Sequence, residues 1–199
     1  MPPKFTGESV SDQLILDYDV ETLATGFADP NWVPQAITVV AWSWYGSDEV
    51  EVSSVIDFNH GPMPHLDPSA QRQMLFPFLE DLKKADVVRF HNGKRFDHPI
   101  VNGACWVANL PPIEAIKVQD TMNFGKVKGI KKGQDNIGEL LGIPLHKLSL
   151  NHYQWLEAYL ESGWPTVKER CVTDVMQHKL IAIEMEYRGW LKPPTLWKP

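Results

Sequence analysis

The chain has 199 residues, of which 43% are hydrophobic and 22% charged, a composition ordinary for a soluble globular protein. This length suits one domain, and the formal net charge of −6 argues against a general nucleic-acid coat protein, which is usually basic. No apolar run approaches the roughly 18–20 residues needed to span a bilayer, so we expect no membrane contact. The two widely spaced cysteines, Cys105 and Cys171, argue against a disulfide framework and are compatible with a reducing cytoplasm.

The hydrophobic pattern predicts an α/β domain that begins with strands and ends with helices. We expect strands at residues 13–21, 36–45, 50–58, 85–91 and 115–119. We expect helices at residues 68–84, 96–109, 134–141, 151–161 and 165–188. This order suits a mixed five-stranded sheet flanked by helices, in which the first strands form a meander and the later ones are joined by helical crossovers.

Turn and capping residues mark several of these boundaries. A Gly-Ser-Asp-Glu connection between the second and third strands predicts a β-hairpin. Asp67 is expected to cap the first helix with Pro68 at its first position, whereas Pro77 predicts a later start or a kink. Outside the domain at residues 13–188, we expect a loose leader at residues 1–12 and an extended tail at residues 189–199 that docks on the body or on a partner.

The first predicted strand carries three acids, Asp17, Asp19 and Glu21, at alternating positions, so their side chains point to one face of the strand. Carboxylates packed this closely repel one another and lose solvation, and they persist when a cation compensates them. Mg²⁺ and Mn²⁺ are the cations that suit several hard oxygen ligands. The alternative is an edge strand whose acidic face meets water, where the acids cost little.

Two more acids stand in positions that could complete such a site. Asp97 follows the predicted strand at residues 85–91 and lies at the start of a helix, where the helix macrodipole alone would favour an acid. Asp174 lies beside the apolar stripe of the last helix, where a solvated flank is the simpler interpretation.

Taken together, D-x-E-T at Asp19, H-N-x₃-F-D ending at Asp97 and T-D-V at Asp174 form a far more specific pattern. The pattern resembles the DEDD (DnaQ-like) 3′–5′ exonucleases of the ribonuclease H-like fold, and the gaps of 76 and 77 residues between the three acidic motifs fit that family. The segment FHNGKRFD and the later pair Asp120-Thr121 are most similar to the exonuclease domain of phage family A DNA polymerases.

The resemblance implies a set of site residues for this chain. The metal-binding carboxylates would be Asp19, Glu21, Asp97 and Asp174. The residues that bind the terminal nucleotide would be Thr22, Asn92 and Phe96. It also implies two ions, Mg²⁺ or Mn²⁺, one lowering the pKa of the attacking water and the other stabilising the leaving 3′-oxygen.

The chain departs from the family pattern at the general base. The family places Tyr four residues, or His five residues, before the last acid, and this chain has Arg170 and Glu169 there. Arginine stays protonated and cannot serve as a base. Either Glu169 substitutes, the hydroxide forms without help, or His178, one helical turn past Asp174, takes the role. The alternative for His178 is a surface histidine.

Two further choices stay open in the sequence. Asp17 and Asp19 could form the metal pair in place of Asp19 and Glu21, although the Thr that follows favours the latter. The basic cluster lies in GKVKGIKKGQ and consists of Lys126, Lys128, Lys131 and Lys132. It would either border the substrate groove and hold phosphates or form a solvated loop.

We therefore predict a metal-dependent 3′–5′ exonuclease that acts on DNA 3′ ends, single-stranded in our expectation, and stands alone because no polymerase segment is present. A ribonuclease of the same fold is one alternative, since nothing in the sequence reads the 2′-hydroxyl recognisably. A catalytically weak nucleic-acid-binding accessory protein is another, suggested by Arg170. We expect a cytoplasmic location, which is the host cytoplasm if the gene belongs to a phage.

Overall fold

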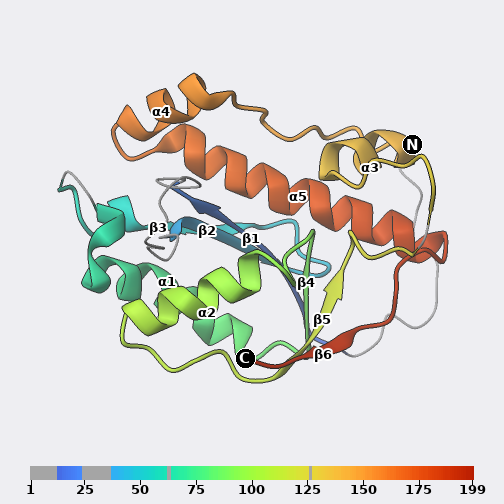
Figure 1. Cartoon of the computed structure of the whole chain (residues 1–199), viewed down its shortest axis with the longest axis horizontal. Coiled ribbons are helices and arrows are strands. Elements are labelled where there is room, and N and C mark those ends of the chain that lie inside the picture. The colour runs from blue at the N-terminus through green and yellow to red at the C-terminus, as the bar shows by residue number, and fades with distance from the viewer. Residues whose placement is uncertain (1–12, 24–36, 62–63, 126) are drawn as a thin grey trace.

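The computed structural model describes residues 13–23, 37–61, 64–125 and 127–199. A six-stranded mixed sheet lies between two layers of helices (Figure 1). The strands are β1 (Ile15–Thr22), β2 (Ile37–Trp44), β3 (Glu51–Ser54), β4 (Val87–Phe90), β5 (Ile116–Asp120) and β6 (Thr195–Trp197). The helices are α1 (Pro68–Leu82), α2 (Asp97–Val107), α3 (Gln134–Leu141), α4 (His152–Leu160) and α5 (Pro165–Tyr187).

The strand order is β3-β2-β1-β4-β5-β6. The first three strands form the predicted antiparallel meander, and β4 and β5 run parallel to β1 after helical crossovers. This mixed α/β sheet with helices on both faces confirms the predicted fold class. The third strand is shorter than predicted, because Val55–Asp57 turn into a 3₁₀ helix.

The sixth strand was not predicted. Thr195–Trp197 lie in the Pro- and Trp-containing tail and pair antiparallel with the outer edge of β5, where Thr195 is opposite Val118. Three residues flanked by prolines carry no strand signal of their own, and the free edge of β5 supplies the hydrogen-bond partners. The tail is therefore extended in its strand β6 and docks on the body of the domain, which is one of the two expected arrangements.

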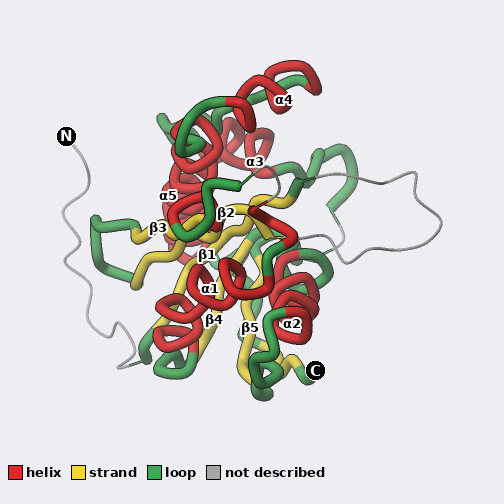
Figure 2. Tube along the Cα trace, turned by 90° about the vertical axis from the view of Figure 1, so that its left-hand side faces the viewer, coloured by secondary structure: helices red, strands yellow, loops and turns green. Residues whose placement is uncertain are grey.

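The two faces of β1 meet different helices. Tyr18 packs on the side of α1 and α2: its ring centroid lies 4.9 Å from that of Phe78, and its hydroxyl lies 2.8 Å from Nδ1 of His98. Asp17 and Asp19 point to the other face, which α5 crosses with α3 and α4 beside it (Figure 2). The strand alternation read from the sequence thus separates an apolar layer from an acidic one.

Capping explains where α1 begins, and exposure to water explains why the helix can continue through Pro77. The backbone N–H of Ser69 donates to Oδ1 of Asp67 at 2.8 Å, which confirms the predicted N-cap. The helix then continues through Pro77 to Leu82, so the later start is wrong. Pro77 is on the exposed side, where water can hydrogen-bond the carbonyl that proline leaves without a donor.

Several predictions concern segments outside the described residues. The leader at residues 1–12 and almost all of the loop after β1 fall in this group, as does Lys126 of the basic cluster. Of the helices that the structure describes, none combines the length and the apolar character that crossing a bilayer requires.

Candidate metal centre

Three of the predicted acids meet where α5 crosses β1. Asp19 and Glu21 lie two residues apart on β1, and Asp174 belongs to α5, the helix that crosses this strand (Figure 1). One carboxylate oxygen from each of these three residues lies within 4.8 Å of the other two. Asp19 and Glu21 are half-buried and Asp174 is buried. We call these three acids together with Asp97 the carboxylate cluster.

Asp97 approaches the same end of β1 from α2. It is the first residue of that helix, is only 3% exposed, and accepts a hydrogen bond from the backbone N–H of Val20 at 3.3 Å. Val20 is the residue between Asp19 and Glu21, so Asp97 is held against the strand segment that carries both acids. Its negative charge is one of the causes that raise the pKa of Asp19.

The cluster is difficult to ionise without a cation. Burial raises the pKa of Glu21 and of Asp97 to about 7, although the charge of Arg170 lowers the pKa of Glu21 and backbone hydrogen bonds lower that of Asp97. Burial and the charges of Asp97, Asp174 and Glu21 raise the pKa of Asp19 well above its ordinary value. A divalent cation reverses this preference, because it favours the ionised form of every carboxylate around it.

Two basic side chains already contact the cluster. Nε of Arg170 donates to Oε1 of Glu21 at 2.9 Å, and its Nη2 lies 3.4 Å from Oδ2 of Asp174. Nζ of Lys147, in the loop between α3 and α4, lies 3.0 Å from the same Asp174 oxygen. The sequence prediction noted Arg170 as a departure at the base position but missed Lys147, which has no motif around it and reaches the site only through the path of its loop.

The donor set fits a hard divalent cation. Oδ1 of Asp174 is buried and has no hydrogen-bond partner within the described part of the protein, whereas Oδ2 contacts both basic groups. A buried oxygen of this kind is costly unless a cation or a water binds it. All four acids offer oxygen, the ligand atom that Mg²⁺ and Mn²⁺ prefer.

The third acid of β1 does not join the cluster. Both oxygens of Asp17 accept hydrogen bonds from Arg89 of β4, at 2.7 and 2.9 Å, and both side chains are fully buried. Asp17 is thus already neutralised, and Asp19 and Glu21 are the acids of β1 that reach Asp174. This favours the Asp19–Glu21 pair over the Asp17–Asp19 pair that the sequence left open.

His178 lies beside Asp17 as well. Its Nδ1 is 3.2 Å from Oδ1 of Asp17, and the side chain is nearly buried, so the surface alternative is wrong. It stands one turn along α5 from Asp174, as predicted, but faces the Asp17–Arg89 pair. Its role as a general base stays a prediction that this contact does not favour.

The three predicted substrate residues lie around the same end of the sheet. Thr22 ends β1, with a register irregularity between it and Glu21. Asn92 follows β4 with a left-handed backbone (φ 65°), and its N–H donates to Oδ1 of Asp120 at 2.8 Å. Phe96 immediately precedes α2 and is 37% exposed.

A polar hollow of about 610 Å³ opens beside Asn92. Residues that line it include Asn92, Lys94, Arg95, Asp120, Lys132 and Trp197. None of these residues belongs to the carboxylate cluster, but the negative charge of Asp120 contributes to the raised pKa of Asp97. Among the described lysines of the predicted basic cluster, Lys132 lines this hollow. Trp197 comes from the unpredicted strand β6, so sequence reasoning had no signal for it.

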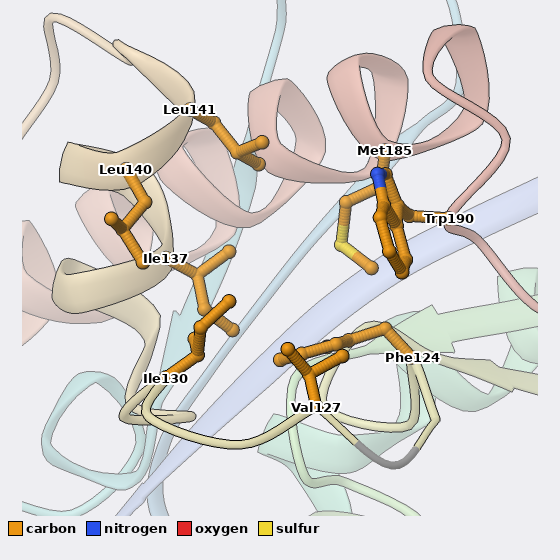
Figure 3. Close-up of a pocket in the computed structure, with 8 residues that line it drawn as sticks. All are labelled: Phe124, Val127, Ile130, Ile137, Leu140, Leu141, Met185 and Trp190. Carbon is orange, nitrogen blue, oxygen red and sulfur yellow. The ribbon is translucent and has the colours of Figure 1, made fainter.

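A second, apolar hollow of about 90 Å³ lies between α3, the end of α5 and the loop after β5 (Figure 3). Phe124, Ile137, Met185 and Trp190 are among the side chains that converge on it. None of the described residues that line it is an acid or a base, and none belongs to the carboxylate cluster.

Comparison with known proteins supports the fold. A scan against protein-family models and a search of curated proteins both find no match. Among solved structures, the chain is similar to the family B DNA polymerase from the hyperthermophilic archaeon Pyrobaculum calidifontis, with a TM-score of 0.61 and 17% sequence identity. The match covers 88% of this chain and 25% of the polymerase chain. Membership of the DEDD family, and the likeness to phage family A polymerases, stay predictions.

Proposed function

We propose that the protein is a metal-dependent 3′–5′ exonuclease that releases nucleotides from DNA 3′ ends. The observation that carries the proposal is the convergence of Asp19, Glu21 and Asp174, from the two ends of the chain, to within 4.8 Å. Asp97 joins them through Val20. Carboxylates packed this closely repel one another and destabilise the fold unless a cation compensates their charge, so such a cluster indicates a functional site.

The carboxylate cluster would hold the divalent cations, Mg²⁺ or Mn²⁺. Bound there, such ions supply Lewis-acid stabilisation of the charge that develops when a phosphodiester is hydrolysed. The part of the protein is to fix the acids before substrate arrives. Backbone and side chains do so, since the N–H of Val20 orients Asp97 and the guanidinium of Arg170 orients Glu21.

The polar hollow supports a nucleic-acid substrate. Lys94, Arg95 and Lys132 place three positive charges around it, although the whole chain carries a net charge of −6. Cations along such a groove bind the phosphates of a strand without reading its sequence, and an indole such as Trp197 can stack on a base. These charges would bind DNA and RNA alike, and the similarity to a DNA polymerase fold is the reason to propose DNA as the substrate.

A second function is supported by one specific contact. Arg170 occupies the position where a general base is expected and holds two of the four acids. A protein without that base would hydrolyse DNA slowly or would act as a nucleic-acid-binding accessory protein. Loss of a general base lowers a rate by about 10²–10⁴-fold, which leaves measurable hydrolysis.

The direct test uses single-stranded DNA labelled at either end. With Mg²⁺ or Mn²⁺, we expect 5′-labelled DNA to shorten stepwise and 3′-labelled DNA to lose its label in the first turnover. EDTA should stop both, and an RNA strand of the same sequence tests the ribonuclease alternative. Asp19→Asn should abolish the reaction, with Glu114→Gln, on an exposed loop, as the matched control. Binding without metal-dependent shortening would replace the exonuclease by the accessory protein.

A further inference from the structure

We propose that Arg170 is a built-in counter-ion of the carboxylate cluster, which competes with divalent cations for Glu21 and Asp174 and sets how many ions the cluster binds. The inference rests on the metal centre of the proposed function. In the protein as folded, one divalent ion would bind tightly, and a second would bind only by displacing the guanidinium.

The position of Arg170 is fixed by contacts outside the cluster. Its guanidinium carbon lies 5.0 Å from the centre of the Trp155 ring on α4, and its Nη1 donates to the backbone carbonyl of Leu148. The side chain is only 12% exposed. Such a guanidinium keeps its charge and is not removed by deprotonation, and displacing it breaks its contacts with Trp155 and Leu148.

The same group occupies one carboxylate oxygen in each of two acids of the cluster. Arg170 contacts Oε1 of Glu21 and Oδ2 of Asp174, and Lys147 contacts that second oxygen as well. Asp19 and Asp97 form no ion pair with any lysine or arginine in the described part of the chain. Two of the four acids are therefore partly neutralised by the protein, and two are left for an external cation.

Charge balance then limits the number of ions. Four ionised carboxylates carry four negative charges, of which Arg170 and Lys147 neutralise two. One divalent ion neutralises the rest. A second divalent ion would leave two excess positive charges in a largely buried site, where an unbalanced charge is strongly unfavourable. Removal of the guanidinium lowers this excess from two positive charges to one and ends the competition of Arg170 for oxygen atoms.

The test is a calorimetric titration of the metal-free protein with Mn²⁺, with no nucleic acid present. We expect wild type to bind one ion tightly and Arg170→Gln to bind a second ion at least about tenfold more tightly than wild type does. Arg188→Gln is the matched control, because it removes one positive charge from the C-terminal end of the same helix, where Arg188 pairs with Glu184 in solvent. It should titrate like wild type.

A purely structural role for Arg170 predicts the opposite, since loss of a packing residue would weaken Mn²⁺ binding. Arg170→Lys keeps the charge and should keep the wild-type ion count. Lys147→Gln, in a loop, provides a second test if Arg170→Gln does not fold, and it should also tighten the second ion. Two tight ions in wild type, or unchanged or weaker binding in Arg170→Gln, would overturn the inference and leave the metal centre intact. If neither protein binds Mn²⁺, both the inference and the metal centre fail.

Discussion

Asp17 and Arg89 are register partners in the parallel pair of β1 and β4, and they form a two-point ion pair in the fully buried interior of the domain. The pair removes one acid of β1 from the carboxylate cluster. It also brings a permanent positive charge under α5, where His178 contacts the same Asp17 oxygen. One strand face therefore has two regions, a closed structural one at Asp17 and an open acidic one at Asp19 and Glu21.

The Asp17–Arg89 pair should stabilise the fold without taking part in metal binding. Arg89→Met leaves the Asp17 carboxylate buried and unpaired, and we expect a loss of about 3–5 kcal/mol in the free energy of unfolding. Urea denaturation measures this loss. The double variant Asp17→Leu/Arg89→Met should recover much of it, because no unpaired charge remains. A small loss in Arg89→Met alone would show that water or another group compensates Asp17.

Asp97 should make the metal-free protein less stable as the pH rises. Burial, mainly, raises its pKa in the fold to about 7, whereas an unfolded aspartate has a pKa of about 3.9. Well below pH 4, Asp97 is protonated in both the folded and the unfolded state, so its burial does not reduce the free energy of unfolding. Between pH 4 and pH 7 Asp97 loses its proton in the unfolded state but keeps it in the folded state, so the free energy of unfolding falls as the pH rises.

The variant Asp97→Asn isolates this effect, because its carbonyl can still accept from Val20 but cannot ionise. Its free energy of unfolding minus that of wild type should rise by a few kcal/mol from pH 4 to pH 8, at about 1.4 kcal/mol per unit of pKa shift. Urea denaturation at a series of pH values in EDTA measures the difference. A difference that does not change with pH would show that Asp97 titrates normally.

The polar hollow should contribute to binding of a DNA strand. Trp197→Ala removes a stacking surface worth about 1–3 kcal/mol per base, so we expect affinity for a short single-stranded oligonucleotide to fall about 5- to 150-fold. Fluorescence anisotropy measures this affinity, and Ca²⁺ takes the place of Mg²⁺ to limit hydrolysis of the DNA during the measurement. Trp106→Ala, at an exposed indole on α2, is the control.

Lys132 should contribute through charge rather than stacking. Lys132→Ala should weaken binding of all sequences alike and lower the dependence of log affinity on log salt by about one. Lys131→Ala removes a neighbouring lysine that does not line the hollow and serves as the control. Equal effects of the two substitutions would show that only the general charge of this loop attracts DNA.

His178 tests the remaining choice of base. Because His178 faces the Asp17–Arg89 pair, we expect His178→Asn to reduce thermal stability while the rate at saturating Mn²⁺ changes less than tenfold. Steady-state hydrolysis and thermal denaturation of the same preparation measure both quantities. A rate loss of about 10²–10⁴-fold with unchanged stability would place His178 in the reaction as a base.

The sequence was sufficient for most of the secondary structure, since these signals are local. The alternation of Asp17, Asp19 and Glu21 with apolar residues predicts the strand and the face of its acids. The run that contains Asp174 predicts a long helix, and Asp67 predicts a helix start. Segments without a hydrophobic period could not be predicted in this way. One of them is the short strand β6, which forms because β5 offers a free edge.

The partners of each charge were decided by tertiary structure alone. The Thr after Glu21 favours Asp19 over Asp17 as a metal ligand, but no local pattern shows that the register of β1 against β4 gives Asp17 a buried arginine. The crossing of α5 over β1 brings Arg170 and Asp174 to Glu21, more than 140 residues earlier in the chain. Side-chain periodicity depends on neighbours along the chain, whereas the neutralisation of a buried charge depends on which groups the folded chain brings within a few ångströms.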